Sequence, residues 1–227
     1  MEPPHRSAPR ERIRYQPWGR LTPPATDVRT VEEPVELAGA WRTGSVLPFG
    51  WGRSYGDVCL NSRGTLLSTE RLHRVLAFDT ETGVIRAQAG MLLSEILDLA
   101  VPRGWFLPVT PGTKHVTLGG AVANDVHGKN HHGAGTIGRH LTALELARSD
   151  GSRLVCSPTE NPEWFRATVG GLGLTGLMVW CELRLIPLPG RGIAVESTRF
   201  GELSEFFQLS EGADRKYAYT VSWIDCL

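Results

Sequence analysis

Clusters of glycine interrupt this 227-residue chain and limit what it can fold into. Three glycines lie within residues 50–56, two at 119–120 and three within 128–135, and Gly112 stands between them. Because glycine weakens the interior of helices and strands, each cluster predicts a loop. Bare backbone also lets several N–H groups approach one anion, so the clusters as a set, with Arg53 and Ser54 beside them, predict a diphosphate cradle. Any single cluster is better explained as an ordinary surface loop.

Two stretches, Gly133–Gly138 and Gly171–Gly176, have the G-x-G-x-x-G spacing of dinucleotide-binding loops. In a Rossmann fold that motif follows a strand and opens a helix, so that the helix N-terminus faces the pyrophosphate. Here both stretches precede a predicted strand, and the second also follows a predicted helix. The order of elements therefore disfavours a Rossmann site.

Composition excludes several classes of protein. Lys plus Arg and Asp plus Glu number 24 each, so the basic excess typical of nucleic-acid binding is missing. The four cysteines are far apart and form no C-x-x-C pair, which indicates reduced thiols rather than a zinc site or a disulfide framework. No apolar run approaches the roughly 18 residues of a membrane helix, and no secretory signal is recognisable. We therefore expect a cytoplasmic protein that binds no nucleic acid.

Hydrophobic periodicity predicts an α+β fold, with helices packed on two small sheets. The pairs of strands on either side of residues 79–83 and of Asp150-Gly151 have the composition of hairpins. Asn161-Pro162 has the pattern of a helix cap followed by proline in the first turn. Strands are expected at 46–48, 75–78, 84–87, 105–109, 141–147, 154–156 and 177–186, and helices at 31–41, 92–101, 117 to about 128, and 163–169.

Composition also divides the chain into three regions. Residues 1–24 are rich in proline and arginine without apolar periodicity, which predicts a disordered lead-in. Residues 25–190 carry the glycine clusters. After the proline-rich break at 187–190, residues 191–227 predict a strand, a helix and a strand that stops at the chain end, as the beginning of an incomplete second domain.

Polar chemistry concentrates in residues 124–132, which contain three histidines within six positions. One hypothesis is a metal site, since imidazole is a good ligand. Gly128 weakens the helix that would place His127 and His131 on one face, and no glutamate or cysteine completes a ligand set. A second hypothesis is a cofactor site in which a histidine and Lys129 supply hydrogen bonds and positive charge. A solvated polar loop is the third.

Four motifs occur in a fixed order: Gly50–Asp57, Pro111–Ala121, His127–His132 and Gly171–Gly176. Together they resemble the FAD-linked oxidases of the vanillyl-alcohol-oxidase type, and the resemblance covers most of residues 15–225. It implies a two-lobed FAD-binding domain of the PCMH type over 25–190. It further implies that 191–227 is the start of a truncated α+β substrate domain.

The resemblance also implies which residues bind FAD. They fall in the first glycine loop, in the second motif and its continuation, and just after the last glycine cluster, where the backbone of Met178 would reach the adenine side. The cofactor-binding set is Gly50, Trp51, Gly52, Arg53, Ser54, Tyr55, Gly56, Asp57, Gly112, Thr117, Leu118, Gly119, Gly120, Asn124, Asp125, Val126, His127 and Met178.

Tyr55 lies in a loop too rich in glycine to be core, so its hydroxyl is free to face a ligand. Many members of the family attach flavin covalently through a histidine in this loop. Tyr55 stands at that position here, so the resemblance implies non-covalent FAD. It places Tyr55, His127 and Lys129 as catalytic candidates, the last two on the flavin face where substrate binds. Trp223, with Lys129, would line the substrate side.

The resemblance is strongest to the branch of the family that oxidises the ribose 2′-hydroxyl of a decaprenyl-phosphate sugar. That reaction is the first half of epimerisation to arabinose for the actinobacterial cell wall. It implies a polyprenyl-phosphate sugar substrate, an NAD(P)H-dependent short-chain reductase as partner, and peripheral association with a membrane through the lipid. The residue usually assigned as base lies in the C-terminal part of members about twice this length. An alditol or aldonolactone oxidase that uses oxygen, and a catalytically incomplete FAD-binding fragment, are the alternatives.

Overall fold

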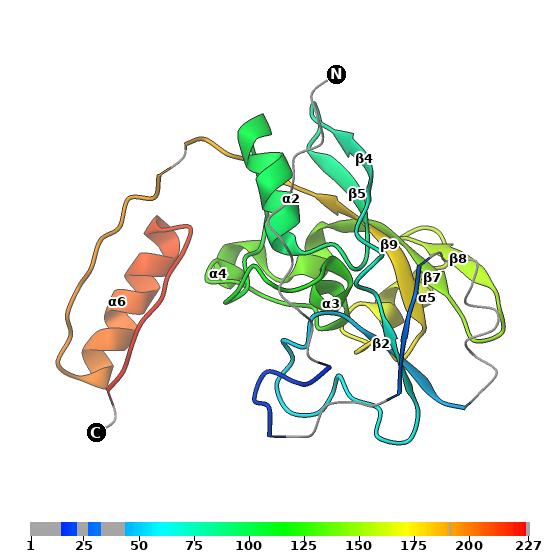
Figure 1. The fold of residues 1–227 in the computed structure, drawn as a ribbon. Coiled ribbons are helices and arrows are strands. Elements are labelled where there is room, and N and C mark those ends of the chain that lie inside the picture. The colour runs from blue at the N-terminus through cyan, green and yellow to red at the C-terminus, as the bar shows by residue number, and fades with distance from the viewer. Residues whose placement is uncertain (1–14, 22–26, 33–43, 191, 226–227) are drawn as a thin grey trace.

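The computed structural model describes residues 15–21, 27–32, 44–190 and 192–225. Figure 1 shows a main body that contains the sheets, and one C-terminal helix set apart from it at the end of an extended arm. Helices and strands are mixed along the chain, as an α+β fold requires. The helix expected at 31–41 lies almost entirely outside the described residues, as does most of the lead-in expected at 1–24.

Two sheets make up most of the main body. The smaller has three parallel strands in the order β1-β3-β2, and the larger has five antiparallel strands in the order β4-β5-β9-β7-β8. A short antiparallel pair joins β10 to β6. The strands are β1 (Val28–Thr30), β2 (Val46–Phe49), β3 (Thr65–Ser68), β4 (Val75–Asp79), β5 (Val84–Gln88), β6 (Trp105–Phe106), β7 (Leu141–Ala147), β8 (Arg153–Cys156), β9 (Leu177–Arg184) and β10 (Ile186–Pro187).

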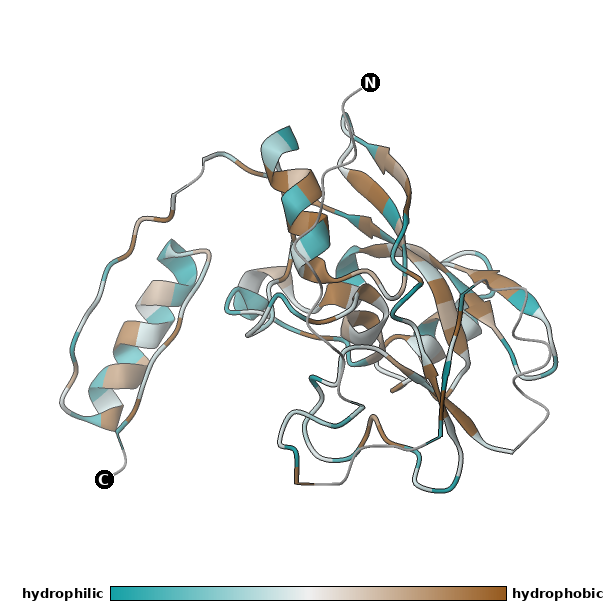
Figure 2. Cartoon of the chain, in the orientation of Figure 1, coloured by the Kyte–Doolittle hydropathy of each residue, from teal (hydrophilic) through white to brown (hydrophobic). Residues whose placement is uncertain are grey.

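Helices pack on the larger sheet and enclose the main core. They are α2 (Leu93–Ala100), α3 (Leu118–Ala123) and α5 (Pro162–Thr168), with short 3-10 turns at Val101–Arg103 and Ile137–His140. The short α4 (His131–Ala134) has no buried residue, and α6 (Leu203–Lys216) stands apart from the main body (Figure 1). Leu93, Ile96 and Ala100 of α2 are buried, and this is the apolar face that the sequence spacing predicts. In Figure 2 hydrophobic (brown) and hydrophilic (teal) residues alternate along α2, as in an amphipathic helix.

Strand β9 forms the centre of the larger sheet and links the two sheets. Cys181 of β9 pairs with Ala87 on one side and Leu144 on the other, and all three are fully buried. Burial raises the pKa of the Cys181 thiol to about 12, so this thiol is protonated and structural. At the start of β9, Leu177 and Val179 pack with residues of the smaller sheet, so one strand takes part in both cores.

Several predicted elements are confirmed. Both hairpins form, β4 with β5 and β7 with β8, and the helix at 92–101 ends before Gly104, which has a φ of +80°. Proline occupies the first turn of α5 as expected. The cap differs, because Asn161 has a φ of +46° and its amide donates to the Val155 carbonyl at 2.7 Å instead of capping the helix.

Other elements are shorter than predicted. The strand expected at 105–109 pairs only at Trp105–Phe106, and the strand expected at 177–186 breaks after Arg184. The helix expected to continue to about 128 ends at Ala123, because the chain reverses at Asp125, which has a φ of +42°. In the described part of 192–225, α6 forms but neither flanking strand does. A strand needs a hydrogen-bonded neighbour, and these segments lie beside no sheet (Figure 1).

Candidate functional site

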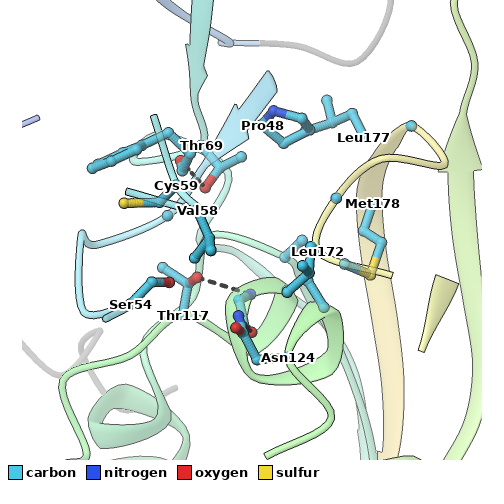
Figure 3. Close-up of a pocket in the computed structure, with 18 residues that line it drawn as sticks. Pro48, Ser54, Val58, Cys59, Thr69, Thr117, Asn124, Leu172, Leu177 and Met178 are labelled. Atoms are coloured by element: carbon cyan, nitrogen blue, oxygen red, sulfur yellow. Dashed lines mark hydrogen bonds between the residues drawn. The ribbon is translucent and has the colours of Figure 1, made fainter. Parts of the chain in front are cut away.

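A cavity lies where three loops meet at the N-terminal end of α3. It encloses about 600 Å³ of space that is open to solvent. Figure 3 shows its walls, which come from the first glycine loop, from α3 and from the loop that leads into β9. Its lining residues are Pro48, Phe49, Gly50, Ser54, Val58, Cys59, Thr69, Ala89, Thr117, Gly119, Gly120, Ala123, Asn124, Leu172, Gly173, Gly176, Leu177 and Met178.

Close backbone contacts bring these loops together. A Cβ added to Gly50 would lie 2.4 Å from the hydroxyl of Thr117, and one added to Gly119 would lie 2.8 Å from the Cβ of Ala89. Neither position has room for a side chain. Glycine at these two positions therefore lets the loop, α3 and the end of β5 meet around one space.

Loop residues 15–21 support the first glycine loop from behind. The N–H of Trp18 donates to the Ser54 carbonyl at 3.0 Å, and the ring of Tyr15 packs against Phe49. Gly52 lies so close to this segment that a Cβ would be 2.3 Å from the Gln16 carbonyl. The described end of the predicted lead-in is thus part of the site's scaffold.

The backbone amides at the start of α3 already have partners. The N–H groups of Leu118 and Gly119 donate to the carbonyls of Met91 and Ala89, both at 2.7 Å. The N–H of Gly120 donates to the Thr117 hydroxyl at 3.1 Å. These amides, which belong to residues of the predicted cofactor-binding set, therefore already donate to acceptors within the protein.

The first glycine loop differs in this respect. Within the described residues, the backbone N–H groups of residues 54–57 donate no hydrogen bond. Gly56 has a φ of +62°, which turns the backbone of this loop. A run of unpaired amides in a turn is a known kind of anion-binding concavity. Residues 54–57 are accordingly the donor set that suits a phosphate group.

The remaining wall of the cavity is apolar. Val58 and Cys59 line one side, and Leu172, Leu177 and Met178 the other. Burial raises the pKa of the Cys59 thiol, with a smaller contribution from the neighbouring Asp57 carboxylate, so the thiol is neutral at pH 7. This wall suits a heteroaromatic or sugar group rather than a charge.

Seven of the predicted cofactor residues line the cavity: Gly50, Ser54, Thr117, Gly119, Gly120, Asn124 and Met178. Others are buried behind it or shape it. Trp51, Gly52 and Leu118 are buried, and Arg53 donates to the Trp51 carbonyl at 3.0 Å with its guanidinium 5.5 Å from the Trp18 ring centroid. The Asp125 carboxylate accepts the Gly138 N–H at 3.0 Å, and the Val126 N–H donates to the Ala121 carbonyl at 3.1 Å.

The remaining predicted residues lie outside the lining. Gly56, Asp57 and Gly112 are exposed, and the side chain of Tyr55 is 81% exposed. Val58 ends the loop 48–58 that the family resemblance implies contacts FAD, whereas the apolar lining residues Cys59 and Leu172 were not predicted. Of these, only Leu172 carries a local signal, since it stands between Gly171 and Gly173.

The histidine-rich loop leads directly into α4, and exposed and buried residues alternate along positions 127–130. His127 and Lys129 are exposed, whereas Gly128 and Asn130 are buried. The Asn130 amide donates to the Pro108 carbonyl at 2.7 Å, and its buried side-chain oxygen has no partner among the described residues. The loop therefore holds His127 and Lys129 toward solvent and anchors itself through the residues between them.

The C-terminal segment touches this same loop. The N–H of Thr220 donates to the Lys129 carbonyl at 2.9 Å, and the His132 ring lies 3.1 Å from the Tyr217 carbonyl. Trp223, three residues beyond, is 83% exposed. None of His127, Lys129 and Trp223 lines the cavity.

Two further properties concern metal and membrane. Across the described ranges, no three His, Cys, Asp or Glu side chains gather closely enough to hold a metal ion. None of the helices in that part of the chain combines the length and apolar character needed to cross a bilayer.

Comparison with known proteins relates this chain to a cofactor-binding family. Residues 25–157 match the family described as FAD binding domain. The chain is 33% identical over 222 residues to decaprenylphosphoryl-β-D-ribose oxidase of Mycolicibacterium smegmatis, covering 94% of this chain and 48% of that protein. It is 28% identical over 184 residues to L-gulonolactone oxidase of Bos taurus, covering 77% and 41%.

A third relative is human Δ(24)-sterol reductase, at 32% identity over 113 residues, which covers 50% of this chain and 22% of that protein. The chain thus spans less than half the length of each of these relatives.

Proposed function

Because this chain belongs to the FAD binding domain family, whose cofactor is FAD, we propose that it is the FAD-binding part of an oxidoreductase that oxidises a secondary hydroxyl of a sugar. The substrate that we favour is the ribose 2′-hydroxyl of a decaprenyl-phosphate sugar, which is oxidised to the 2′-ketone. The observation that carries the proposal is the cavity in which the glycine loop, α3 and the loop before β9 meet.

The residues around the cavity fit FAD. Unpaired amides at 54–57 suit its diphosphate, and the wall of Val58, Cys59, Leu172, Leu177 and Met178 suits its adenosine part. When bound, FAD supplies a two-electron acceptor, which no side chain can provide. The protein's contribution is to hold FAD and the substrate in the relative position that the reaction requires.

His127 and Lys129 are the residues that we propose for the substrate side. Their alternation with buried Gly128 and Asn130 points both side chains away from the core. The Lys129 ammonium would bind the phosphate of a sugar phosphate, and the His127 imidazole would hold or accept a proton from the sugar hydroxyl. Trp223 would contact the sugar or its carrier from the C-terminal segment.

We further propose that the FAD is not covalently attached. Tyr55 stands where many relatives of this kind carry a histidine, and its phenol points into solvent. A polyprenyl-phosphate sugar, an NAD(P)H-dependent short-chain reductase and a membrane surface reached through the lipid are the partners that this function implies. The 33% sequence identity to the ribose oxidase, in an alignment that covers 94% of this chain, supports this choice.

An absorption experiment tests the proposal. The purified chain is loaded with FAD and made anaerobic, and decaprenyl-phosphate ribose is added while the flavin band is followed. Bleaching of the band, with retention of the bleached state until an acceptor is added, supports the proposal. A loaded chain whose flavin band is unchanged by this sugar phosphate contradicts the oxidation proposed for this chain and favours the catalytically incomplete FAD-binding fragment.

A second candidate is an aldonolactone oxidase, which the match to L-gulonolactone oxidase over 77% of the chain favours. In the same experiment, bleaching by L-gulono-1,4-lactone with hydrogen peroxide released on admission of air would favour this candidate. Bleaching by the sugar phosphate but not by the lactone would exclude it.

A further inference from the structure

We propose that Leu172 is a cofactor-binding residue that, with Val58, clamps the adenosine part of FAD. The inference rests on the proposed function, because it concerns the same cavity. It assigns a role to a residue that lies outside the expected cofactor-binding set, and it starts from an unusual backbone conformation.

Leu172 occupies a conformation that its side chain disfavours. Its φ is +53°, and the other non-glycine residues with positive φ in the described chain are Arg20, Asp125 and Asn161. Asn and Asp tolerate this left-handed region, whereas a branched apolar residue does so at a cost. Glycine would avoid this cost, and glycines stand on both sides of Leu172. A leucine at this position therefore calls for a reason beyond the turn itself.

The surrounding structure fixes this conformation. The N–H of Leu172 donates to the carbonyl of Ala123, the last residue of α3, at 2.8 Å. Gly171 is packed against the end of α5, where an added Cβ would lie 2.2 Å from the Ala167 carbonyl. Leu172 is thus tied to the helix whose opposite end also lines the cavity.

The side chain of Leu172 faces the cavity instead of the core. It lines the cavity and is 42% exposed, and Val58 on the first glycine loop is 45% exposed. Figure 3 shows both side chains directed into the space between their two loops. Two large apolar side chains left open on the walls of one cavity gain most when a ligand covers them.

The chemistry of the walls indicates which part of FAD they hold. A diphosphate needs N–H donors, and these lie at 54–57 on the rim. Leu172 has Leu177 and Met178 as neighbours on the lining, so its surroundings are apolar. The residues proposed for the flavin side, His127 and Lys129, do not line the cavity. A planar base with two apolar faces is what remains to fit between Val58 and Leu172.

The test compares Leu172→Gly with Leu174→Gly. Leu174 is a matched control because it lies in the same loop, is 78% exposed and does not line the cavity. FAD and ADP are each titrated into the three proteins by calorimetry, and melting is followed without ligand. We expect Leu172→Gly to weaken both FAD and ADP by about tenfold, because it deletes one apolar wall. Its melting temperature without ligand should stay equal or rise, because the strained φ suits glycine.

Leu174→Gly should leave both affinities within about twofold of the unchanged chain, since the lost side chain touches no ligand. Equal affinity of Leu172→Gly and the unchanged chain for FAD and ADP would overturn the clamp while leaving the proposed function intact. Loss of FAD affinity without loss of ADP affinity would also overturn it, because Leu172 would then act on the flavin half. An unchanged chain that binds neither ligand would overturn the proposed function itself.

Discussion

Gly50 is the residue on which the geometry of the cavity depends most directly. Its missing side chain lets the first glycine loop touch Thr117, whose hydroxyl also caps α3 by accepting the N–H of Gly120. One contact therefore joins the loop, the helix cap and the cavity wall. The sequence indicates that a glycine here permits close approach, but it does not reveal that the approaching group is the hydroxyl of Thr117.

Gly50→Ala should weaken FAD binding and lower stability. The new Cβ would meet the Thr117 hydroxyl at 2.4 Å, so either the loop or the cap must shift, at a cost of about 1–3 kcal/mol. Calorimetric titration with FAD and thermal melting measure both effects. Gly133→Ala is the control: a Cβ there meets nothing within 4 Å, so FAD affinity should stay unchanged, and stability should stay equal or rise because Gly133 lies in α4. Equal FAD affinity and equal melting temperature in the two variants would show that the contact between Gly50 and Thr117 supports neither binding nor stability.

Cys59 offers a chemical probe of the same cavity. It is half-buried on the lining, whereas Cys156 and Cys181 are buried. Only the thiolate reacts with N-ethylmaleimide, and burial raises the pKa of Cys59, so labelling should be slow at pH 7 and accelerate as the pH rises past the ordinary thiol value. Bound FAD should cover the thiol and suppress labelling.

Mass spectrometry of a Cys226→Ser background isolates this reaction, because it removes the fourth cysteine and the other two, Cys156 and Cys181, are buried. The Cys59→Ser variant should take up no label while folded. Labelling of Cys59 at the same rate with and without saturating FAD would place the cofactor elsewhere.

Hydrophobic periodicity predicted some helices and strands more reliably than others. The most reliable predictions were of elements whose contacts lie within the element itself or with the next strand in the sequence. The helix α2 and the two hairpins follow from residues close together in sequence, and the structure confirms them. The segments on either side of α6 have the composition of strands, but a strand exists only beside a partner, and none of the strands in the described ranges lies next to them. Their sequence could not reveal this.

Leu172 and Asn161 show a second limit. Both have positive φ, and both conformations are held by hydrogen bonds to residues that a local pattern does not identify, Ala123 for one and Val155 for the other. Glycine spacing predicted the loop around Leu172 but not which side chain it would present to the cavity. Tertiary contacts decided that.

The C-terminal segment is held to the histidine-rich loop by a contact that can be removed selectively. Thr220→Pro deletes the N–H that donates to the Lys129 carbonyl at 2.9 Å, whereas Thr220→Val keeps it. We expect trypsin to cleave after Arg215 and Lys216 faster in the proline variant than in the valine variant, because local opening exposes the site. Equal cleavage rates would indicate that the segment is held by other contacts.

At the scale of the whole molecule, the smaller and larger sheets share the start of β9, and the cavity lies beside this junction. Loops that are far apart in sequence meet there because the topology brings their ends together. Composition identified the loops as one set, and the family resemblance supplied the cofactor. Part of the apolar wall escaped both, since Cys59 and Leu177 carry no sign of a binding role in the sequence, whereas Met178 was predicted.

FAD should therefore stabilise the whole chain. Ligand at about a hundredfold excess over Kd stabilises the folded state by about 2.7 kcal/mol. For a chain of this size that corresponds to a rise in melting temperature of about 5–10 °C. Scanning calorimetry with and without FAD measures it, and FMN, which lacks the adenosine part, serves as control and should give a smaller rise. Flavin recovered in the supernatant after heat precipitation would confirm non-covalent attachment, and flavin retained in the pellet would contradict it.

Hydrogen–deuterium exchange with and without FAD tests the central claim most directly. The unpaired amides of residues 54–57 should exchange more slowly when FAD is bound, because the diphosphate becomes their acceptor. The amides of Leu118, Gly119 and Gly120 should change little, because they are already hydrogen-bonded. Slowing confined to the start of α3, with residues 54–57 unaffected, would contradict the account and place the phosphates on the helix instead.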